Sequence, residues 1–258
     1  MTPKDKNIIV TGGAHGIGQG LCRRFAAEGA ARIAVVDVDQ NAAEAVASDI
    51  GAQAYSVDIS DATAFAETLE VIRSDMGHVD LFCSNAGVGY PDGDHVASAS
   101  DELWEKSWRI NVHAHVVATR VLLPQMLERE AGHFMITASA AGLLSQIGSA
   151  SYSVTKHAAV GYAESLAIMH GDKGINVSLL CPQGVDTRMM AAVAGGGPQG
   201  ADGVISIEAL CDSVMDGLAS GEFLILPHPQ VADYMQFKSA NYDKWLAGMR
   251  KLRDQFAG

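Results

Sequence analysis

The 258-residue sequence is poor in cysteine, and the shortage excludes two classes of site. The four cysteines, Cys22, Cys83, Cys181 and Cys211, lie far apart and form no C-x-x-C pair. A disulfide framework and a zinc site are therefore not expected, and we expect no metal. Cys83 and Cys181 lie in apolar runs, where a thiol acts as a small hydrophobe. Free thiols indicate a reducing compartment such as the cytoplasm.

Positive charge and long hydrophobic runs are also scarce. The sequence contains 18 Lys and Arg residues and 30 Asp and Glu residues, which gives a net charge of −12. An acidic surface repels phosphate backbones, so nucleic acid is not an expected partner. No stretch has the length of a membrane span, and the apolar run near the start is too short for a signal peptide. We expect a cytoplasmic protein with no membrane association.

What the chain has is an alternation of short apolar runs with helical patterns. The expected strands are 7–11, 32–37, 52–58, 79–85, 133–139, 175–181 and 222–226. The expected helices are 16–30, 41–50, 61–77, 101–130, 151–170 and 205–220. We expect Asp61 to cap the third helix and Pro124 to break the fourth. The alternation predicts one α/β domain with a doubly wound parallel sheet of about seven strands and helices on both faces.

The composition shows no linker, repeat or low-complexity tract, so residues 1–258 are expected to form a single domain. The glycine-rich region within 187–205 is expected to be a mobile loop. The extension 227–258 is charged and amphipathic, and it could pack on its own subunit or on a neighbour.

A glycine-rich turn, TGGAHGIG, lies at 11–18 between the first strand and the first helix. Glycines allow a tight turn and a close approach of the backbone to a pyrophosphate, and the helix N-terminus offers free N–H groups. The spacing is neither G-x-G-x-x-G nor a P-loop. A tight turn with no ligand therefore remains an alternative at this point.

Asp37 ends the second strand, 19 residues after Gly18. A carboxylate there can accept hydrogen bonds from both ribose hydroxyls of an adenosine, and it would repel a 2′-phosphate. No Lys or Arg stands at position 15 or 38. This pattern favours NAD over NADP, with an N-cap role for Asp37 as the alternative.

Tyr152 and Lys156 are four residues apart within SYSVTKHAAV, so they share one helical face. A tyrosine has an ordinary pKa of about 10, too high for a base at neutral pH. A nearby ammonium favours the phenolate, so we expect Lys156 to lower the pKa of Tyr152. A half-buried tyrosine beside a solvent-facing lysine is the alternative.

With these motifs in order, the chain resembles the classical short-chain dehydrogenases/reductases from about residue 5 to residue 226. The resemblance is carried by T-G-x-x-x-G-x-G at 11–18, Asp58, N-A-G at 85–87, Asn111, Ser139 and Y-x-x-x-K at 152–156. It implies a Rossmann-type fold, an NAD cofactor and a homotetramer or homodimer built on the long helix, the Tyr152 helix and the last helix and strand.

The resemblance also implies roles for single residues. Tyr152 would be the general acid/base, Lys156 would hold the nicotinamide ribose, Ser139 would orient the substrate oxygen, and Asn111 would support a proton relay. The implied cofactor contacts are Gly12, Gly16, Ile17, Gly18, Asp37, Asp58, Ile59, Asn85, Ala86, Gly87, Tyr152, Lys156, Val185 and Thr187. The implied substrate contacts are Ser139, Tyr152 and Gln183.

One departure from the family pattern is visible in CPQGVDT, 181–187, where Gln183 replaces a usual glycine. The segments 140–146 and 183–205 are expected to select the substrate, and their apolar character favours a lipophilic or alicyclic secondary alcohol or its ketone. A sugar-alcohol dehydrogenase and a non-catalytic dinucleotide-binding or assembly protein stay open as alternatives. A nucleotide-sugar epimerase or dehydratase is disfavoured by the short chain.

Overall fold

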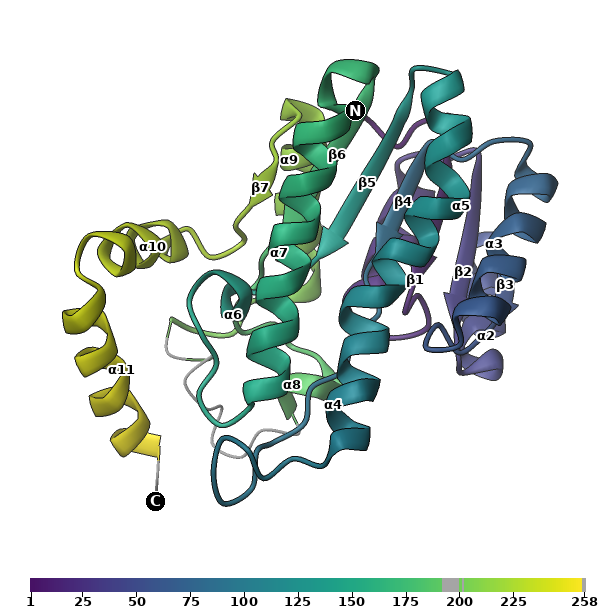
Figure 1. The fold of residues 1–258 in the computed structure, drawn as a ribbon. Helices are drawn as coiled ribbons and strands as arrows, with labels where there is room; N and C mark the ends of the chain where they lie inside the picture. The colour runs from purple at the N-terminus through teal and green to yellow at the C-terminus, as the bar shows by residue number, and fades with distance from the viewer. Residues whose placement is uncertain (192–199, 201, 257–258) are drawn as a thin grey trace.

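Seven parallel strands form one sheet in the order β3-β2-β1-β4-β5-β6-β7 (Figure 1). The structure, a computed structural model, describes residues 1–191, 200 and 202–256. The strands are β1 (Asn7–Thr11), β2 (Arg32–Asp37), β3 (Gln53–Ser56), β4 (Leu81–Ser84), β5 (Gly132–Thr137), β6 (Ile175–Leu180) and β7 (Leu224–Ile225). Every strand register is parallel, which confirms the expected doubly wound α/β sheet of the Rossmann type.

Helices cover both faces of this sheet. In chain order, the helices of the described residues are α1 (Gly16–Ala27), α2 (Gln40–Ile50), α3 (Ala62–Met76), α4 (Asp101–Trp108), α5 (Ala114–Glu128), α6 (Ala140–Leu143), α7 (Ala150–His170), α8 (Arg188–Ala191), α9 (Ile207–Ser220), α10 (Gln230–Ala240) and α11 (Tyr242–Phe256). One core contains Phe65 of α3 and Leu122 of α5, and the other contains Phe25 of α1 and Val214 of α9. Continuous apolar strands are buried between these two layers, as a parallel sheet requires.

The helix caps follow from local sequence. Asp61 accepts hydrogen bonds from the N–H groups of Thr63 and Ala64, as expected for the N-cap of α3. Gly51 follows α2 at a φ of +68°, a left-handed conformation that suits glycine at a helix end.

The expected break at Pro124 is wrong. Pro124 lies inside α5 on its exposed face, where the carbonyl that loses its partner can reach water. The irregularity is instead a π-helical turn at Arg109–His113 between α4 and α5. A π turn of this kind often marks a functional position, and this one contains Asn111.

The region predicted to be mobile, 187–205, includes residues 192–199 and 201, which lie outside the described residues. The extension after β7 forms α10 and α11, which stand away from the sheet in Figure 1. In the described part of the chain, no helix has both the length and the apolar composition of a membrane span.

Candidate functional site

The glycine turn after β1 is a place where only glycine fits. A Cβ on Gly18 would lie 2.0 Å from the carbonyl oxygen of Gly12, and a Cβ on Gly12 would lie 2.9 Å from the Cα of Ala86. Gly12 and Gly16 have φ angles of +66° and +52°, which L side chains rarely adopt. The turn therefore presents bare backbone at the carboxyl edge of the sheet.

The N-terminus of α1 points out of this turn and, among the described residues, has no side-chain cap. Its N-cap, His15, makes no side-chain capping hydrogen bond, and the first turn, which includes Gly16, Ile17 and Gly18, contains no acidic residue. A hollow of about 740 Å³ opens beside it, lined in part by Gly16 and Thr187. Free N–H groups and the positive end of the helix dipole suit an anion here.

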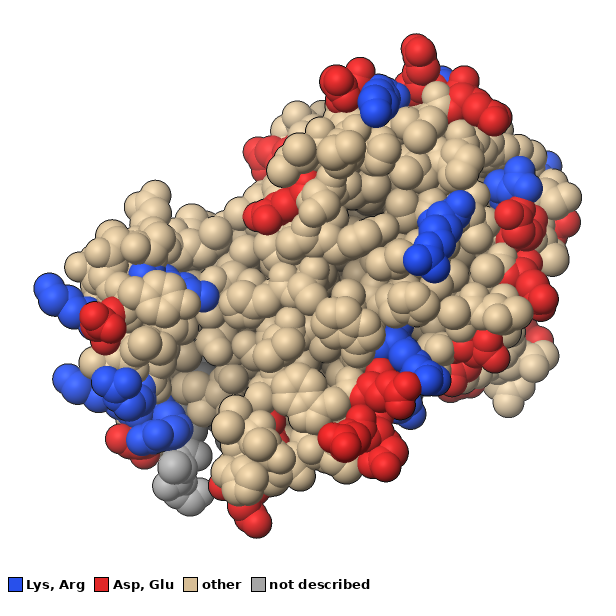
Figure 2. Space-filling view, in the orientation of Figure 1, with Lys and Arg blue, Asp and Glu red and all other residues tan. Residues whose placement is uncertain are grey.

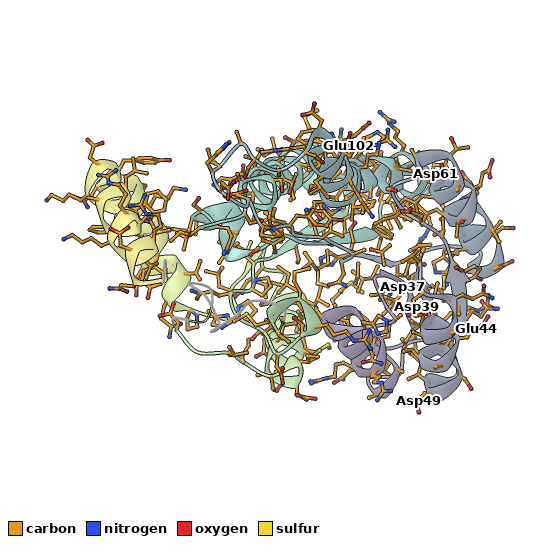
Figure 3. All side chains as sticks on the ribbon, turned by 90° about the horizontal axis from the view of Figure 1, so that it is seen from below. Asp37, Asp39, Glu44, Asp49, Asp61 and Glu102 are labelled. Atoms are coloured by element: carbon orange, nitrogen blue, oxygen red, sulfur yellow. The ribbon has the colours of Figure 1, made fainter. Side chains whose placement is uncertain are left out.

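Asp37 is held against the glycine turn at the end of β2. Its carboxylate accepts hydrogen bonds from Ala14 N at 3.0 Å and from Asp39 N at 3.1 Å. The N-cap alternative for Asp37 is wrong, because Asp39 caps α2 by accepting from Ala42 N. Figure 3 shows Asp37 and Asp39 together, with Glu44 farther along α2. This edge of the site is acidic.

Asn85, Ala86 and Gly87 follow β4 and are tied to the end of β1. Thr11 Oγ1 accepts from the backbone N–H of Asn85 at 3.0 Å and of Ala86 at 3.2 Å. Asn85 Nδ2 donates to Thr11 O at 3.1 Å. A Cβ on Gly87 would lie 3.3 Å from both Lys156 Nζ and Asn111 Oδ1. The N-A-G segment thus links the glycine turn to the residues around Lys156.

Two other expected cofactor segments lie at the same edge of the sheet. Asp58, after β3, accepts from Ser60 N at 2.9 Å and is followed by the half-buried Ile59. Val185, after β6, is buried. Thr187 lies over the glycine turn, with its Cγ2 atom 3.3 Å from where a Cβ on Gly16 would be.

Ser139, Tyr152 and Lys156 come together from β5 and α7. Ser139 caps α6, with its Oγ accepting from Ala141 N at 3.1 Å and donating to Pro182 O at 3.3 Å. Tyr152 also bonds to Ser139, and its ring centre lies 5.6 Å from Lys156 Nζ. Lys156 donates to Thr137 O at 2.8 Å and is buried.

The expected effect of Lys156 on Tyr152 differs from what the structure shows. Burial raises the pKa of Tyr152, and the hydrogen bond with Ser139 opposes that rise. Burial lowers the pKa of Lys156 to about 8, so its charge is itself only partly retained above neutral pH. The Lys156 ammonium is directed to Thr137 O, and desolvation is the larger effect on the phenol.

Asn111 uses its whole side chain to join three segments. Its Oδ1 accepts from Val88 N at 2.9 Å, and its Nδ2 donates to Val88 O at 2.9 Å and Thr155 Oγ1 at 3.0 Å. Thr155 precedes Lys156 on α7, and Val88 follows the N-A-G segment. Asn111 therefore fixes the Lys156 helix against the loop after β4.

Gln183 lies at the other side of Ser139. Its backbone N–H donates to His228 Nδ1 at 3.3 Å. Its side-chain oxygen is buried and has no hydrogen-bond partner in the described part of the chain. Pro182 O, next to it, accepts from Ser139.

Sequence reasoning missed Thr11, His228 and His115. Thr11 stands in the glycine motif but was not expected to join β1 to β4. His115, one turn after Asn111, is buried with its Nδ1 atom 2.6 Å from Ser84 Oγ. Burial and the charge of Lys156 lower the pKa of His115 to about 3, so it is neutral. No sequence pattern marks these contacts, because each joins residues distant in the chain.

The match to known proteins extends over most of the chain. A model of the family described as short chain dehydrogenase matches residues 6–195. The chain is 34% identical over 231 residues to 1-deoxy-11-beta-hydroxypentalenate dehydrogenase of Streptomyces exfoliatus, covering 87% of this chain and 84% of the relative. It is 40% identical over 138 residues to retinol dehydrogenase 10-A of Danio rerio, covering 52% of this chain and 40% of that protein.

Solved structures have the same fold. A short chain dehydrogenase/reductase from Burkholderia phymatum in complex with NAD superposes with a TM-score of 0.84 at 24% identity, covering 94% of this chain and 96% of that one. A 3-ketoacyl-(acyl-carrier-protein) reductase from Brucella melitensis complexed with NADH gives 0.80 at 26% identity, covering 88% and 99%. The chain thus belongs to the classical short-chain dehydrogenase/reductase family and is an oxidoreductase with a Rossmann-type sheet.

Proposed function

We propose that the protein is an NAD(H)-dependent oxidoreductase that interconverts a secondary alcohol and its ketone. The observation that carries this proposal is the convergence of Ser139, Tyr152 and Lys156 beside the glycine turn. Residues from β1, β5 and α7 meet at one edge of the sheet, where parallel strands present their carboxyl ends. Such an edge is where ligands of open α/β sheets bind.

The residues around the glycine turn fit a dinucleotide. A Cβ at Gly12 or Gly18 would collide with neighbouring backbone, so the turn keeps bare backbone for a pyrophosphate, and among the described residues no side chain caps the α1 N-terminus beside it. Asp37 would hold the adenosine ribose, Asp58, Ile59 and the N-A-G segment would flank the adenosine, and Val185 with Thr187 would face the nicotinamide. When bound, the nicotinamide supplies or accepts the hydride.

The chain's own residues handle the proton. We infer that Tyr152 Oη takes the hydroxyl proton during oxidation and returns it during reduction. Ser139 Oγ would turn from Pro182 O toward the substrate oxygen and donate to it. Lys156 would hold the nicotinamide ribose and carry positive charge beside the phenol, while Asn111 keeps α7 in place.

We propose that Asp37 selects NAD over NADP. Asp37→Ser removes a carboxylate that would bind both ribose hydroxyls, so the affinity for NAD should fall by about tenfold. Loss of the negative charge should also relieve repulsion of a 2′-phosphate, so the preference for NAD over NADP should shrink. Steady-state kinetics with each cofactor measure both effects.

Glu44→Gln is the matched control for this change, because Glu44 is an exposed acid on the adjacent helix α2. It should leave cofactor preference unchanged. An equal shift in both variants would attribute the preference to general surface charge and not to Asp37.

We propose a lipophilic or alicyclic substrate. The segment Ala140–Leu144, which we expect to form one wall of the substrate site, is uncharged and apolar. The two relatives compared above are named for 1-deoxy-11-beta-hydroxypentalenate and for retinol. Gln183, whose side-chain oxygen has no partner among the described residues, would contribute a polar contact to the substrate.

The test is a panel of cyclic, aromatic, steroid and sugar alcohols, with NADH formation followed by absorbance. NAD-dependent turnover of alicyclic or steroid alcohols is expected, with weaker turnover of sugar alcohols. Tight NADH binding with no turnover of any alcohol or ketone would favour a dinucleotide-binding protein without catalysis. Turnover of sugar alcohols alone would assign the substrate to that class.

We also propose a homo-oligomer in the cytoplasm. Trp108 of α4 and Val154 of α7 are 48% and 50% exposed, although both are large and apolar. These two helices contact each other and belong to the surface expected to pair subunits. The four cysteines are free and buried, which suits a reducing compartment.

A further inference from the structure

The C-terminal extension is joined to the walls of the site by specific hydrogen bonds. Lys238 of α10 donates through Nζ to Leu143 O at 2.9 Å and Leu144 O at 2.6 Å. His228, just before α10, accepts from Gln183 N at 3.3 Å. The family match ends at residue 195, so Lys238 and His228 lie outside it, whereas their partners lie within it.

The two carbonyls bound by Lys238 are at the end of the helix that Ser139 begins. The helix α6 spans only Ala140–Leu143, with Ser139 as its N-cap. Terminal carbonyls of a helix lack partners within it, and a cation near that end satisfies them. A helix this short has little stability of its own, so a bond at one end restrains the other.

The ammonium of Lys238 contacts four residues of the protein. Two of its three N–H groups go to Leu143 O and Leu144 O, and its Nζ also lies 4.9 Å from the Trp245 ring centre and 5.9 Å from that of Tyr242. This aromatic pair packs edge to face, at 5.8 Å between the ring centres. Lys238 thus commits two of its N–H groups to the end of α6 and lies against the aromatic pair, and the segment that it supports is itself uncharged and apolar.

The C-terminal extension restrains Ser139 indirectly, through the two segments to which the Ser139 hydroxyl is hydrogen-bonded. Its Oγ accepts from Ala141 N within α6, whose far end is bonded to Lys238. Its Oγ also donates to Pro182 O, and the next residue, Gln183, is bonded to His228. Tyr234, one turn before Lys238 on α10, donates to Asp202 at 2.8 Å.

We propose that Lys238 is a positioning residue that fixes the wall Ala140–Leu144 and, through α6, the hydroxyl of Ser139. The inference rests on the proposed alcohol–ketone function, because it assigns Lys238 to the geometry of that reaction. It also deepens the substrate assignment, since the segment that Lys238 holds is uncharged and apolar and would receive an apolar part of the substrate.

Lys238→Met tests the proposal, because methionine retains much of the apolar stem and lacks the ammonium. We expect kcat to fall by about tenfold, since a small misplacement of an orienting group is costly. KM should rise for bulky alicyclic alcohols that reach the wall and not for small alcohols. Lys238→Arg should restore most of the rate, because a guanidinium can donate to both carbonyls.

The matched control is Lys244→Met, since Lys244 is an exposed lysine on α11 that faces neither carbonyl. It should leave kcat, KM and the NADH dissociation constant unchanged. An equal loss in both lysine variants, or no rescue by Lys238→Arg, would overturn the positioning role.

Hydrogen–deuterium exchange supplies a readout that needs no turnover. The N–H groups of Ala140, Ala141, Gly142 and Leu144 are all hydrogen-bonded in the structure. Their exchange should be several-fold faster in Lys238→Met than in the wild type or Lys244→Met. Unchanged exchange would overturn the proposal. A wild type with no alcohol turnover would refute the proposed function, and the exchange result would still decide whether Lys238 restrains α6.

Discussion

Tyr152→Phe is expected to lower kcat for alcohol oxidation by about 10³-fold, because it removes the group that takes the hydroxyl proton. NADH affinity should change little. The Tyr152 ring packs beside Gly89, whose added Cβ would lie 3.2 Å from Cδ2, and the phenylalanine ring can keep that contact. Steady-state oxidation of an alcohol from the panel, with NADH binding followed by fluorescence, measures both quantities.

Tyr162→Phe is the matched control, since Tyr162 lies on the same helix and its phenol is away from Ser139. It should keep the wild-type rate.

Because burial raises the pKa of Tyr152, wild-type oxidation should become faster as the pH rises toward that pKa, while ketone reduction becomes slower. A Tyr152→Phe enzyme that retains most of its rate would show that another group moves the proton.

Gly18→Ala should weaken NADH binding by about 100-fold, which corresponds to about 2.7 kcal/mol. The added Cβ would lie 2.0 Å from Gly12 O and 2.7 Å from Asn85 Nδ2, so the turn must shift. Overpacking of this kind costs about 1–3 kcal/mol, so the melting temperature should also fall. Isothermal titration with NADH and thermal unfolding provide the two measurements.

Gly161→Ala is the comparison for this change. Gly161 lies in α7 with nothing within 4 Å of an added Cβ, so alanine there should preserve binding and slightly favour the helix. If Gly18→Ala bound NADH as tightly as Gly161→Ala does, the glycine turn would not be the pyrophosphate cradle.

Local sequence was sufficient for most of the fold. β1 and β2 begin and end at the residues expected from the sequence, and Asp61 caps α3 as its residue type predicts. The position of the helix irregularity was not predictable in this way. Pro124 is tolerated on the exposed face of α5, whereas Asn111 lies in a π turn bonded to Val88 and Thr155 from distant segments.

The sequence by itself determined the order of strands and helices, the glycine turn and the shared face of Tyr152 and Lys156, because these depend on residue types at short spacing. Only the tertiary structure decided what surrounds them. It set the raised pKa of Tyr152 and the lowered pKa of Lys156, since burial depends on every element packed around the site. It also brought Lys238 to the end of α6. Lys238 is separated along the chain from Leu143 by 95 residues and from Leu144 by 94, so no local pattern encodes this contact.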